Sequence, residues 1–231
     1  MPFFGDLIFT SVAGWFFRKL LKFLYRFIVS RYIPSFIDEL RIHTKDCSSI
    51  LDIGCGNSSP VKWLPKKIYK VGIDAYKPCI ENSRKLKIHD KYYQMDISDI
   101  GLKIKPKTFD CVVALDVIEH LNKEEGLKLI AAMEKIACKK IIIFTPNGFL
   151  PQSAHDNNPF QVHRSGWTCN EMESLGFKVI GINGWKQLRG ECAYIKYQPY
   201  WLWQIISDLT QILVRNRPEY AFQLLCIKTV D

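Results

Sequence analysis

The sequence of 231 residues lacks any Cys-x-x-Cys pair, although it contains eight cysteines. Structural zinc sites take their ligands from such closely spaced pairs, and disulfide-stabilised domains need a denser cysteine framework. We therefore expect neither a zinc site nor a disulfide framework. Isolated thiols are typical of proteins in a reducing compartment, which favours a cytoplasmic location. The cysteines stand at positions 47, 55, 79, 111, 138, 169, 192 and 226.

A long uncharged hydrophobic run is also missing. Residues 3–29 are mostly apolar and aromatic, but four cations interrupt them and no small-residue cleavage site follows. A membrane-spanning helix needs about 18 or more apolar residues in succession, and a signal peptide ends in a cleavage site. We therefore expect neither in this stretch. The four cations are Arg18, Lys19, Lys22 and Arg26.

On a helix of about 100° per residue, these cations fall in one sector and the apolar side chains in the opposite one. A basic amphipathic helix of this kind lies in a membrane interface, with its cations at the lipid headgroups. A helix that covers the domain's own core or its active-site mouth has the same pattern, so both interpretations stay open. We assign residues 1–45 to an N-terminal amphipathic helical segment. Its apolar side is formed by Phe16, Phe17, Leu20, Phe23, Leu24, Phe27 and Ile28.

The balance of charges is strongly basic, with a net charge of +9 and a pI of about 9.1. Such a chain is attracted to anionic partners, which include nucleic acid, acidic lipid surfaces and phosphorylated substrates. Charge alone does not choose among these three.

From Ser49 onward, short apolar runs alternate with polar helical stretches, which predicts βαβ units around a parallel sheet. We expect one domain over residues 46–231, of the doubly wound α/β class. Gly176 is expected to end a helix before another strand begins. Strands are predicted near 49–53, 70–74, 92–94, 110–115, 140–144, 178–182 and 221–228. Helices are predicted near 60–65, 78–86, 117–121, 124–137 and 169–175.

Two segments exceed what a minimal domain of this class needs. The first is a long loop over Thr145–Trp167, and loops of this length in compact domains are functional or disordered. The second is an insertion over 184–218 that contains a helix with one apolar stripe. A stripe of this kind is normally core, which favours packing on the domain itself, while its Trp and Tyr residues also suit a membrane interface. The stripe consists of Leu202, Ile205, Ile206, Leu209 and Leu213, preceded by Tyr194, Tyr197, Tyr200, Trp201 and Trp203.

A glycine-containing loop follows the first predicted strand, in the stretch Leu51–Gly56. Gly54 and Gly56 allow the backbone to turn tightly and to approach a small ligand. The pattern has no third glycine, because Ser58 stands near its place, which argues against a pyrophosphate ligand. Asp52, at the strand end, is expected to hold an ammonium group of the ligand directly or through water.

Acidic residues end the next two predicted strands. Asp74, with Ala75 after it, stands where a carboxylate can accept both hydroxyls of a ribose. Asp96 is expected to accept an adenine amino group, and Ile97 to cover the ring. The strand that ends at Leu115 reaches the switch point of the sheet, where open α/β sheets bind ligands.

The ordered set LDIGCG, VGIDA, MDISD, FDCVVALDVIEHL and IIIFTPNG resembles the class I S-adenosylmethionine-dependent methyltransferase family, over residues 48–183 and the last strand. The resemblance implies a seven-stranded, mostly parallel Rossmann-like sheet with an antiparallel final strand. It also implies that S-adenosylmethionine is the cofactor. The residues it assigns to cofactor binding are Gly54, Gly56, Asp74, Asp96 and Leu115.

The stretch Asp116–His120 offers two acids and an imidazole on one face, if a helix begins there. It is similar to the Glu-x-x-Glu-His stretch of ubiquinone-biosynthesis O-methyltransferases and of small-RNA 3′-end 2′-O-methyltransferases, which binds a divalent metal. The latter family also has a histidine shortly before a Trp, as His163 precedes Trp167 here. The resemblance thus implies a site for a metal such as magnesium, formed by Asp116, Glu119, His120 and His163. The alternative is that Glu119 and His120 only cap and orient the start of the helix and bind no metal.

Transfer to a hydroxyl requires a group that removes its proton or lowers its pKa. His163 and His120 are the candidate catalytic residues, and His163 is favoured over His155. Arg164 and Trp167 beside His163 can bind an anionic or ring-shaped acceptor.

We expect a methyltransferase that acts on a hydroxyl of a small-molecule, lipid-linked, isoprenoid or glycan acceptor, peripheral on the inner face of a membrane. RNA ribose 2′-O-methylation is the first alternative, although no RNA-binding module is recognisable. A non-catalytic partner subunit with the same fold is the second.

Overall fold

The computed structural model describes residues 33–153 and 158–230. The predicted amphipathic helix within 3–29 and the candidate His155 lie outside the described residues.

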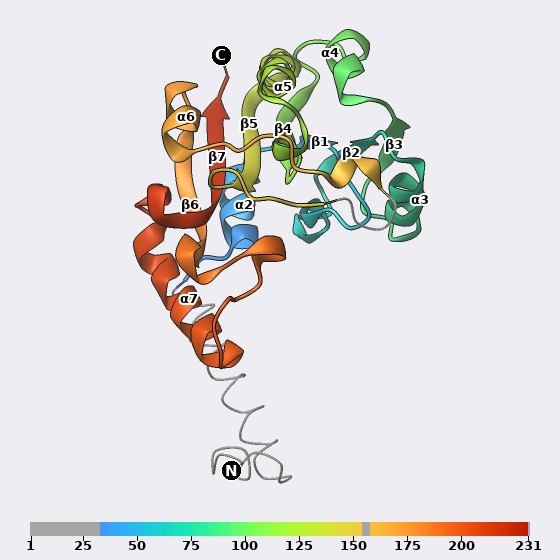
Figure 1. Cartoon of the computed structure of the whole chain (residues 1–231). Helices are drawn as coiled ribbons and strands as arrows, with labels where there is room; N and C mark the ends of the chain where they lie inside the picture. Colours follow the sequence, from blue (N-terminus) through green and yellow to red (C-terminus); the bar gives the residue numbers. More distant parts are fainter. Residues whose placement is uncertain (1–32, 154–157, 231) are drawn as a thin grey trace, which may run out of the picture.

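Seven strands form one sheet in the order β3-β2-β1-β4-β5-β7-β6. The first five strands are parallel, and β7 runs antiparallel to both β5 and β6 (Figure 1). This confirms the predicted doubly wound sheet with its antiparallel final strand. The strands are β1 (Ser49–Ile53), β2 (Tyr69–Asp74), β3 (Lys91–Gln94), β4 (Phe109–Leu115), β5 (Ala137–Pro146), β6 (Lys178–Trp185) and β7 (Ala221–Thr229).

The helices begin at residues with capping side chains in several places. Asn122 and Glu125 form a capping box at the start of α5, and Thr168 and Glu171 form one at the start of α6. The helices are α2 (Phe36–Thr44), α3 (Lys77–Lys85), α4 (Ile100–Lys103), α5 (Lys123–Ile136), α6 (Cys169–Ser174) and α7 (Tyr200–Val214). Single 3₁₀ turns are η2 (Pro60–Trp63), η3 (Ile97–Asp99), η4 (Ile118–His120), η5 (Pro159–Gln161), η6 (Lys186–Leu188), η7 (Glu191–Ala193) and η8 (Pro218–Tyr220).

Two of the predicted helices are wrong in type. The stretches predicted as helices near 60–65 and 117–121 are the 3₁₀ turns η2 and η4. In η2, Ser59 caps the turn and the chain becomes extended at Leu64, just before Pro65. In η4, the chain is again extended at Leu121, just before the capping residue of α5.

The core lies on both faces of the sheet, because side chains alternate along each strand. Val112 belongs to the cluster that Met133 of α5 completes, whereas Val113 belongs to the cluster with Leu40 of α2. Both faces are therefore covered, and the carboxyl ends of the parallel strands stay open at one edge.

Helix α7 packs against the edge strand β6, as the packing interpretation of the insertion predicts, but not through the predicted stripe. Its buried residues are Ser207, Gln211 and Val214. The Gln211 amide donates to the Gly181 carbonyl at 2.7 Å and accepts from the Gly184 N–H at 2.9 Å. The exposed strand edge has backbone groups that need hydrogen-bond partners, which explains why a polar helix face lies against it.

Three of the five residues of the predicted stripe of α7 instead face outward, and Ile205 and Ile206 are only partly buried. Leu202, Leu209 and Leu213 are 38%, 50% and 69% exposed. The expectation that these residues form core is therefore wrong. Within residues 33–153 and 158–230, no helix has both the length and the apolar character that a membrane span requires.

Replacement of Gln211 by Leu is expected to lower the free energy of unfolding by about 1–3 kcal/mol, because it leaves two buried backbone groups of β6 without a partner. Urea denaturation measures this change. The exposed neighbour Ile212, substituted as Ile212→Gln, is the control and is expected to change stability by less than about 0.5 kcal/mol. Equal stability of Gln211→Leu and the native chain would contradict this account of the helix.

Candidate active site

A cavity opens at the carboxyl ends of β1, β2 and β4. The residues that line it include seven of the eight predicted cofactor contacts and four residues of the long loop. The lining comprises Gly54, Cys55, Gly56, Ser58, Ser59, Pro60, Asp74, Ala75, Cys79, Asp96, Ile97, Leu115, Asp116, Val117, His120, Leu121, Glu125, Asn158, Phe160, Gln161 and Arg164. The cavity therefore lies at the carboxyl ends of the strands, at the point where the strand order of the sheet reverses.

The glycine loop turns at two left-handed residues. Gly54 and Gly56 have φ angles of +68° and +55°, which residues with a side chain rarely adopt. A Cβ atom at Gly54 would also lie 2.6 Å from the Val117 side chain. The loop conformation therefore depends on glycine at both positions.

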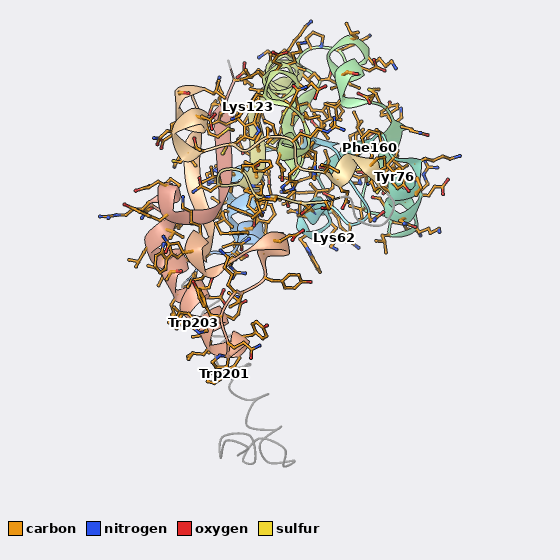
Figure 2. The ribbon with its side chains drawn as sticks, in the orientation of Figure 1. Lys62, Tyr76, Lys123, Phe160, Trp201 and Trp203 are labelled. Atoms are coloured by element: carbon orange, nitrogen blue, oxygen red, sulfur yellow. The ribbon has the colours of Figure 1, made fainter. Side chains whose placement is uncertain are left out.

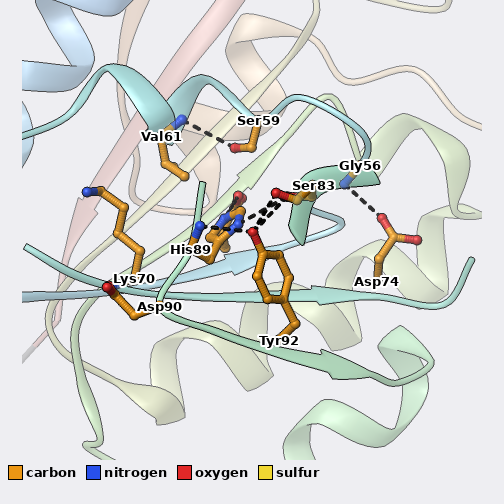
Figure 3. A network of polar contacts seen from close by, with 10 residues as sticks. Gly56, Ser59, Val61, Lys70, Asp74, Ser83, His89, Asp90 and Tyr92 are labelled. Atoms are coloured by element: carbon orange, nitrogen blue, oxygen red, sulfur yellow. Dashed lines mark hydrogen bonds and ion pairs between the residues drawn. The ribbon is translucent and has the colours of Figure 1, made fainter. Parts of the chain in front are cut away.

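Asp74 ties this loop to the end of β2. Its carboxylate accepts from the Gly56 N–H at 2.8 Å (Figure 3). It also accepts from the Tyr76 N–H at 2.8 Å. Burial raises the pKa of Asp74, and the two backbone hydrogen bonds oppose that rise. Asp74 and Ala75 both line the cavity, so the carboxylate is held in place beside the ligand space.

Asp52 does not reach the cavity. Its side chain is 1% exposed, and its Oδ2 lies 2.8 Å from Nε2 of His89. Asp52 is therefore not among the residues that line the cavity, although the sequence analysis expects it to hold an ammonium group directly or through water. Sequence reasoning missed His89, because a single histidine in a loop carries no pattern.

The His89 imidazole sits in a polar network beneath the glycine loop. Its Nδ1 lies 3.4 Å from the Ser83 hydroxyl, and its backbone N–H donates to the Tyr92 hydroxyl at 3.0 Å (Figure 3). That hydroxyl donates in turn to the Ser83 carbonyl at 2.8 Å. The network connects β1, α3 and β3, and it supports the strand from which the loop departs.

Asp96, Ile97 and Leu115 all line the cavity, as the sequence predicts. The Asp96 carboxylate accepts from the backbone N–H and the hydroxyl of Ser98, and these bonds lower its pKa. Asp96 thereby caps η3 and is held as an anion beside Ile97.

Asp116 redirects the chain at the end of β4. It adopts a φ angle of +53°, in the left-handed region. Its carboxylate accepts from the Gln223 amide at 3.0 Å, and burial raises its pKa to about 7. Asp116 lines the cavity, and its carboxylate is bonded to Gln223 of β7.

Glu119, His120 and His163 come together beside the cavity, which His120 lines. Each offers one ligand atom, and these atoms lie within 4.8 Å of one another. Three of the four predicted metal ligands thus lie together, and the fourth, Asp116, does not join them. The reason is local: Asp116 has a left-handed backbone and η4 begins only at Ile118, so no continuous helix places its carboxylate on one face with Glu119 and His120.

The two imidazoles are held by backbone carbonyls. Nδ1 of His163 donates to Leu150 at 2.6 Å, and Nδ1 of His120 donates to Val162 at 3.3 Å, since a carbonyl only accepts. The neutral rings therefore carry their lone pairs on Nε2. Burial lowers the pKa of both histidines, for His120 to about 4 with a further lowering by His163. Both are neutral near pH 7.

The Glu119 carboxylate is buried and accepts from the Thr145 hydroxyl at 3.0 Å. Burial raises its pKa well above the usual range, and the neighbouring Asp116 raises it further. Among residues 33–153 and 158–230, no lysine or arginine forms an ion pair with Glu119. A buried carboxylate without such a partner is costly unless a cation or a proton neutralises it.

The long loop is pinned to η4 by the Glu119 backbone. Its carbonyl accepts from the N–H groups of Arg164 at 2.8 Å and Ser165 at 3.1 Å. Trp167, which the sequence analysis offered as an acceptor contact, is only 2% exposed and packs in the core, while Arg164 does line the cavity. Phe160, on η5, also lines the cavity and was missed (Figure 2).

Comparisons with known proteins agree with this geometry. A family model described as a methyltransferase domain matches residues 51–140. No curated protein matches the sequence.

Several solved structures are similar in fold. One is a SAM-dependent methyltransferase from Archaeoglobus fulgidus, with a TM-score of 0.53 at 20% identity, covering 93% of this chain and 99% of that one. Another is the methyltransferase domain of bacterial CtHen1, with a TM-score of 0.53 at 17% identity, covering 84% and 97%. A third is the plantazolicin methyltransferase BpumL in complex with SAH, with a TM-score of 0.51 at 17% identity, covering 96% and 92%.

Replacement of Asp74 by Asn is expected to weaken binding of S-adenosylmethionine about tenfold or more, because one of the two loop N–H groups then faces an amide donor. Isothermal titration calorimetry measures the affinity. Asp90→Asn is the matched control: Asp90 accepts from the Lys70 N–H at 2.7 Å at the opposite end of β2. If Asp90→Asn weakened S-adenosylmethionine binding as much as Asp74→Asn does, the effect would not be local to the site.

Proposed function

We propose that this chain, whose residues 51–140 match a methyltransferase domain, is a class I S-adenosylmethionine-dependent methyltransferase that methylates a hydroxyl group presented to Glu119, His120 and His163. The acceptor is a lipid-linked, isoprenoid or glycan molecule at a membrane surface. The observation that carries the proposal is the meeting of these three side chains, from two distant segments, beside the cofactor cavity.

The cofactor lies along the carboxyl ends of β1, β2 and β4 in this proposal. The glycine loop contacts its amino-acid part, Asp74 accepts the ribose hydroxyls, and Asp96 and Ile97 receive the adenine. Leu115 borders the same space. The position of these residues around one cavity supports the assignment.

Methyl transfer is an in-line displacement, in which the acceptor oxygen forms a bond to the methyl carbon as the carbon–sulfur bond breaks. The products are the methyl ether, S-adenosylhomocysteine and the proton of the hydroxyl. The protein has to align the two reactants and to exclude water. His120 lines the cavity and also belongs to the cluster. An acceptor hydroxyl beside its ring would therefore lie next to both the cofactor space and the cluster.

The donor set of the cluster fits a divalent cation. One buried carboxylate and two neutral imidazoles are ligands that such ions accept, and the Nδ1 bonds to carbonyls orient the rings as in other metal sites. Burial raises the pKa of Glu119, and a cation bound beside it would favour its ionised form. A bound cation would lower the pKa of the acceptor hydroxyl.

The acceptor side of the cavity combines an aromatic ring, a guanidinium and amides. Phe160, Arg164, Asn158 and Gln161 all come from the long loop and line the cavity. This mixture suits a substrate with a ring or chain and several hydroxyl or anionic groups, such as a sugar or a lipid-linked phosphate.

The native chain is expected to bind one equivalent of Mn²⁺, used as the probe cation, and His163→Ala is expected to weaken that binding about 100-fold. Titration calorimetry measures the affinity, with S-adenosylmethionine binding as the check that the fold is intact.

The matched control is His43→Ala. His43 also faces a buried glutamate, with its Nε2 3.6 Å from Glu39, but it lies outside the cluster. Unchanged Mn²⁺ affinity is expected for this variant. Absence of Mn²⁺ binding to the native chain, or equal loss in both variants, would contradict the metal assignment.

Methyl-labelled S-adenosylmethionine, incubated with the protein and a total cell extract, is expected to label the lipid or glycan fraction. The label should resist mild base, because an ether does and an ester does not. Label in the RNA fraction would contradict the acceptor class and favour ribose methylation, and base-labile label would contradict a hydroxyl acceptor. The Asp74→Asn variant is the control and is expected to lose the labelling.

A further inference from the structure

Helix α7 presents its most apolar side away from the protein. The strongly exposed residues are Tyr200 at 57%, Trp201 at 61%, Leu209 at 50%, Ile212 at 54% and Leu213 at 69%. We call this set, with the half-exposed Leu202, the α7 outer face. A series of large apolar side chains on one helix is more than the scattered exposure of ordinary surfaces, and such patches mark interaction sites.

The opposite side of the same helix is polar and is already used. Ser207, Thr210 and Gln211 form hydrogen bonds to the segment 181–189. Turning the helix to bury its leucines would break these bonds and leave the edge of β6 unsatisfied. The outward direction of the α7 outer face is therefore set by hydrogen bonding, so its apolar surface needs a partner outside the described fold.

The composition of this face matches a lipid interface. Trp201 and Trp203 stand at the end of α7 farthest from the sheet (Figure 2). Trp203 stacks at a tilt on Tyr197 with ring centroids 5.1 Å apart, and its Nε1 donates to the Gln198 carbonyl. Trp and Tyr favour the boundary between headgroups and acyl chains, while leucine and isoleucine favour the apolar side of it.

Charges around the face favour anionic headgroups. The single charged residue within α7 is Asp208, and it is paired with Arg189 at 3.4 Å. Exposed charges flank the helix, with Lys186, Glu191 and Lys196 before it and Arg217 and Glu219 after it, so cations outnumber acids three to two. This excess of positive charge favours an anionic headgroup.

The chain outside the described residues adds to this argument. The described chain begins at Ile33, just before α2, and the ion pair of Arg215 with Glu39 ties the end of α7 to α2 (Figure 1). The 32 residues that precede Ile33 contain five Lys or Arg and one Asp, with ten aromatic residues. A strongly basic and aromatic segment thus precedes α2 in the sequence.

The insertion also connects this face with the acceptor side of the active site. Glu191, on η7 between β6 and α7, is close enough to His163 to act on its charge.

We infer that the α7 outer face is the site at which the protein docks on an anionic lipid surface. The inference rests on the proposed function in one respect, because docking would bring the enzyme to an acceptor held in the membrane. Vesicle binding itself is measured without an acceptor and without methyl transfer.

The test is co-sedimentation of the full chain with phosphatidylcholine vesicles, with and without phosphatidylglycerol. The native protein is expected to bind the anionic vesicles and to be released by added salt. The triple variant Trp201→Ser, Leu209→Ser, Leu213→Ser is expected to lose about 30-fold or more in partitioning, because three large apolar side chains no longer enter the interface.

The matched control is Leu86→Ser with Leu102→Ser, whose leucines are 60% and 87% exposed but belong to other parts of the surface. Its partitioning is expected to stay within about twofold of the native value. Unchanged S-adenosylmethionine affinity in all three proteins shows that the fold and the cofactor site are intact.

Absence of native binding to anionic vesicles, or equal binding by the triple variant, would overturn the inference. A native dimer in sedimentation velocity that the triple variant converts to a monomer would overturn it in favour of a second copy of the chain. Failure of Mn²⁺ binding or of methyl transfer, with vesicle binding intact, would contradict only the proposed function.

Discussion

The backbone carbonyl of Glu119 holds the acceptor side of this molecule together. It accepts two N–H groups, from Arg164 and Ser165, across a separation of about 45 residues in the chain. These bonds fasten the long loop to the turn after β4 and bring His163 to His120. Together with the buried Trp167, whose indole donates to the Ile118 carbonyl, they fix the loop beside the cavity. A backbone contact thus determines where the side-chain chemistry is placed.

The cofactor side is organised by a second carboxylate, Asp74, which accepts from the loop and from the residue after its own strand. The two sides differ in what they require. The cofactor side rests on short-range contacts at neighbouring strand ends, while the acceptor side rests on contacts between distant segments. Variation in the acceptor loop can therefore change the substrate without disturbing the cofactor site.

Sequence patterns predicted the sheet well, because strand polarity and alternation are local properties. The glycine loop, Asp74, Asp96 and Leu115 were placed at the cavity for the same reason: each follows a strand whose end position is evident from its apolar run. Asp52 is the instructive exception. It is also at a strand end, yet its side chain points to the other face and meets His89, and period-two alternation does not reveal such a partner.

The sequence by itself determined the fold class, the cofactor loop and the apolar character of α7, since these depend on residue type and spacing. Tertiary structure decided which side of α7 is buried, because hydrogen bonds to the edge of β6 outweigh the packing of its leucines. It also decided that Asp116 stands apart from Glu119, His120 and His163, because a left-handed residue and a 3₁₀ turn replace the expected helix. Hydrogen-bond satisfaction of the backbone acts across the whole chain, so no local pattern expresses it.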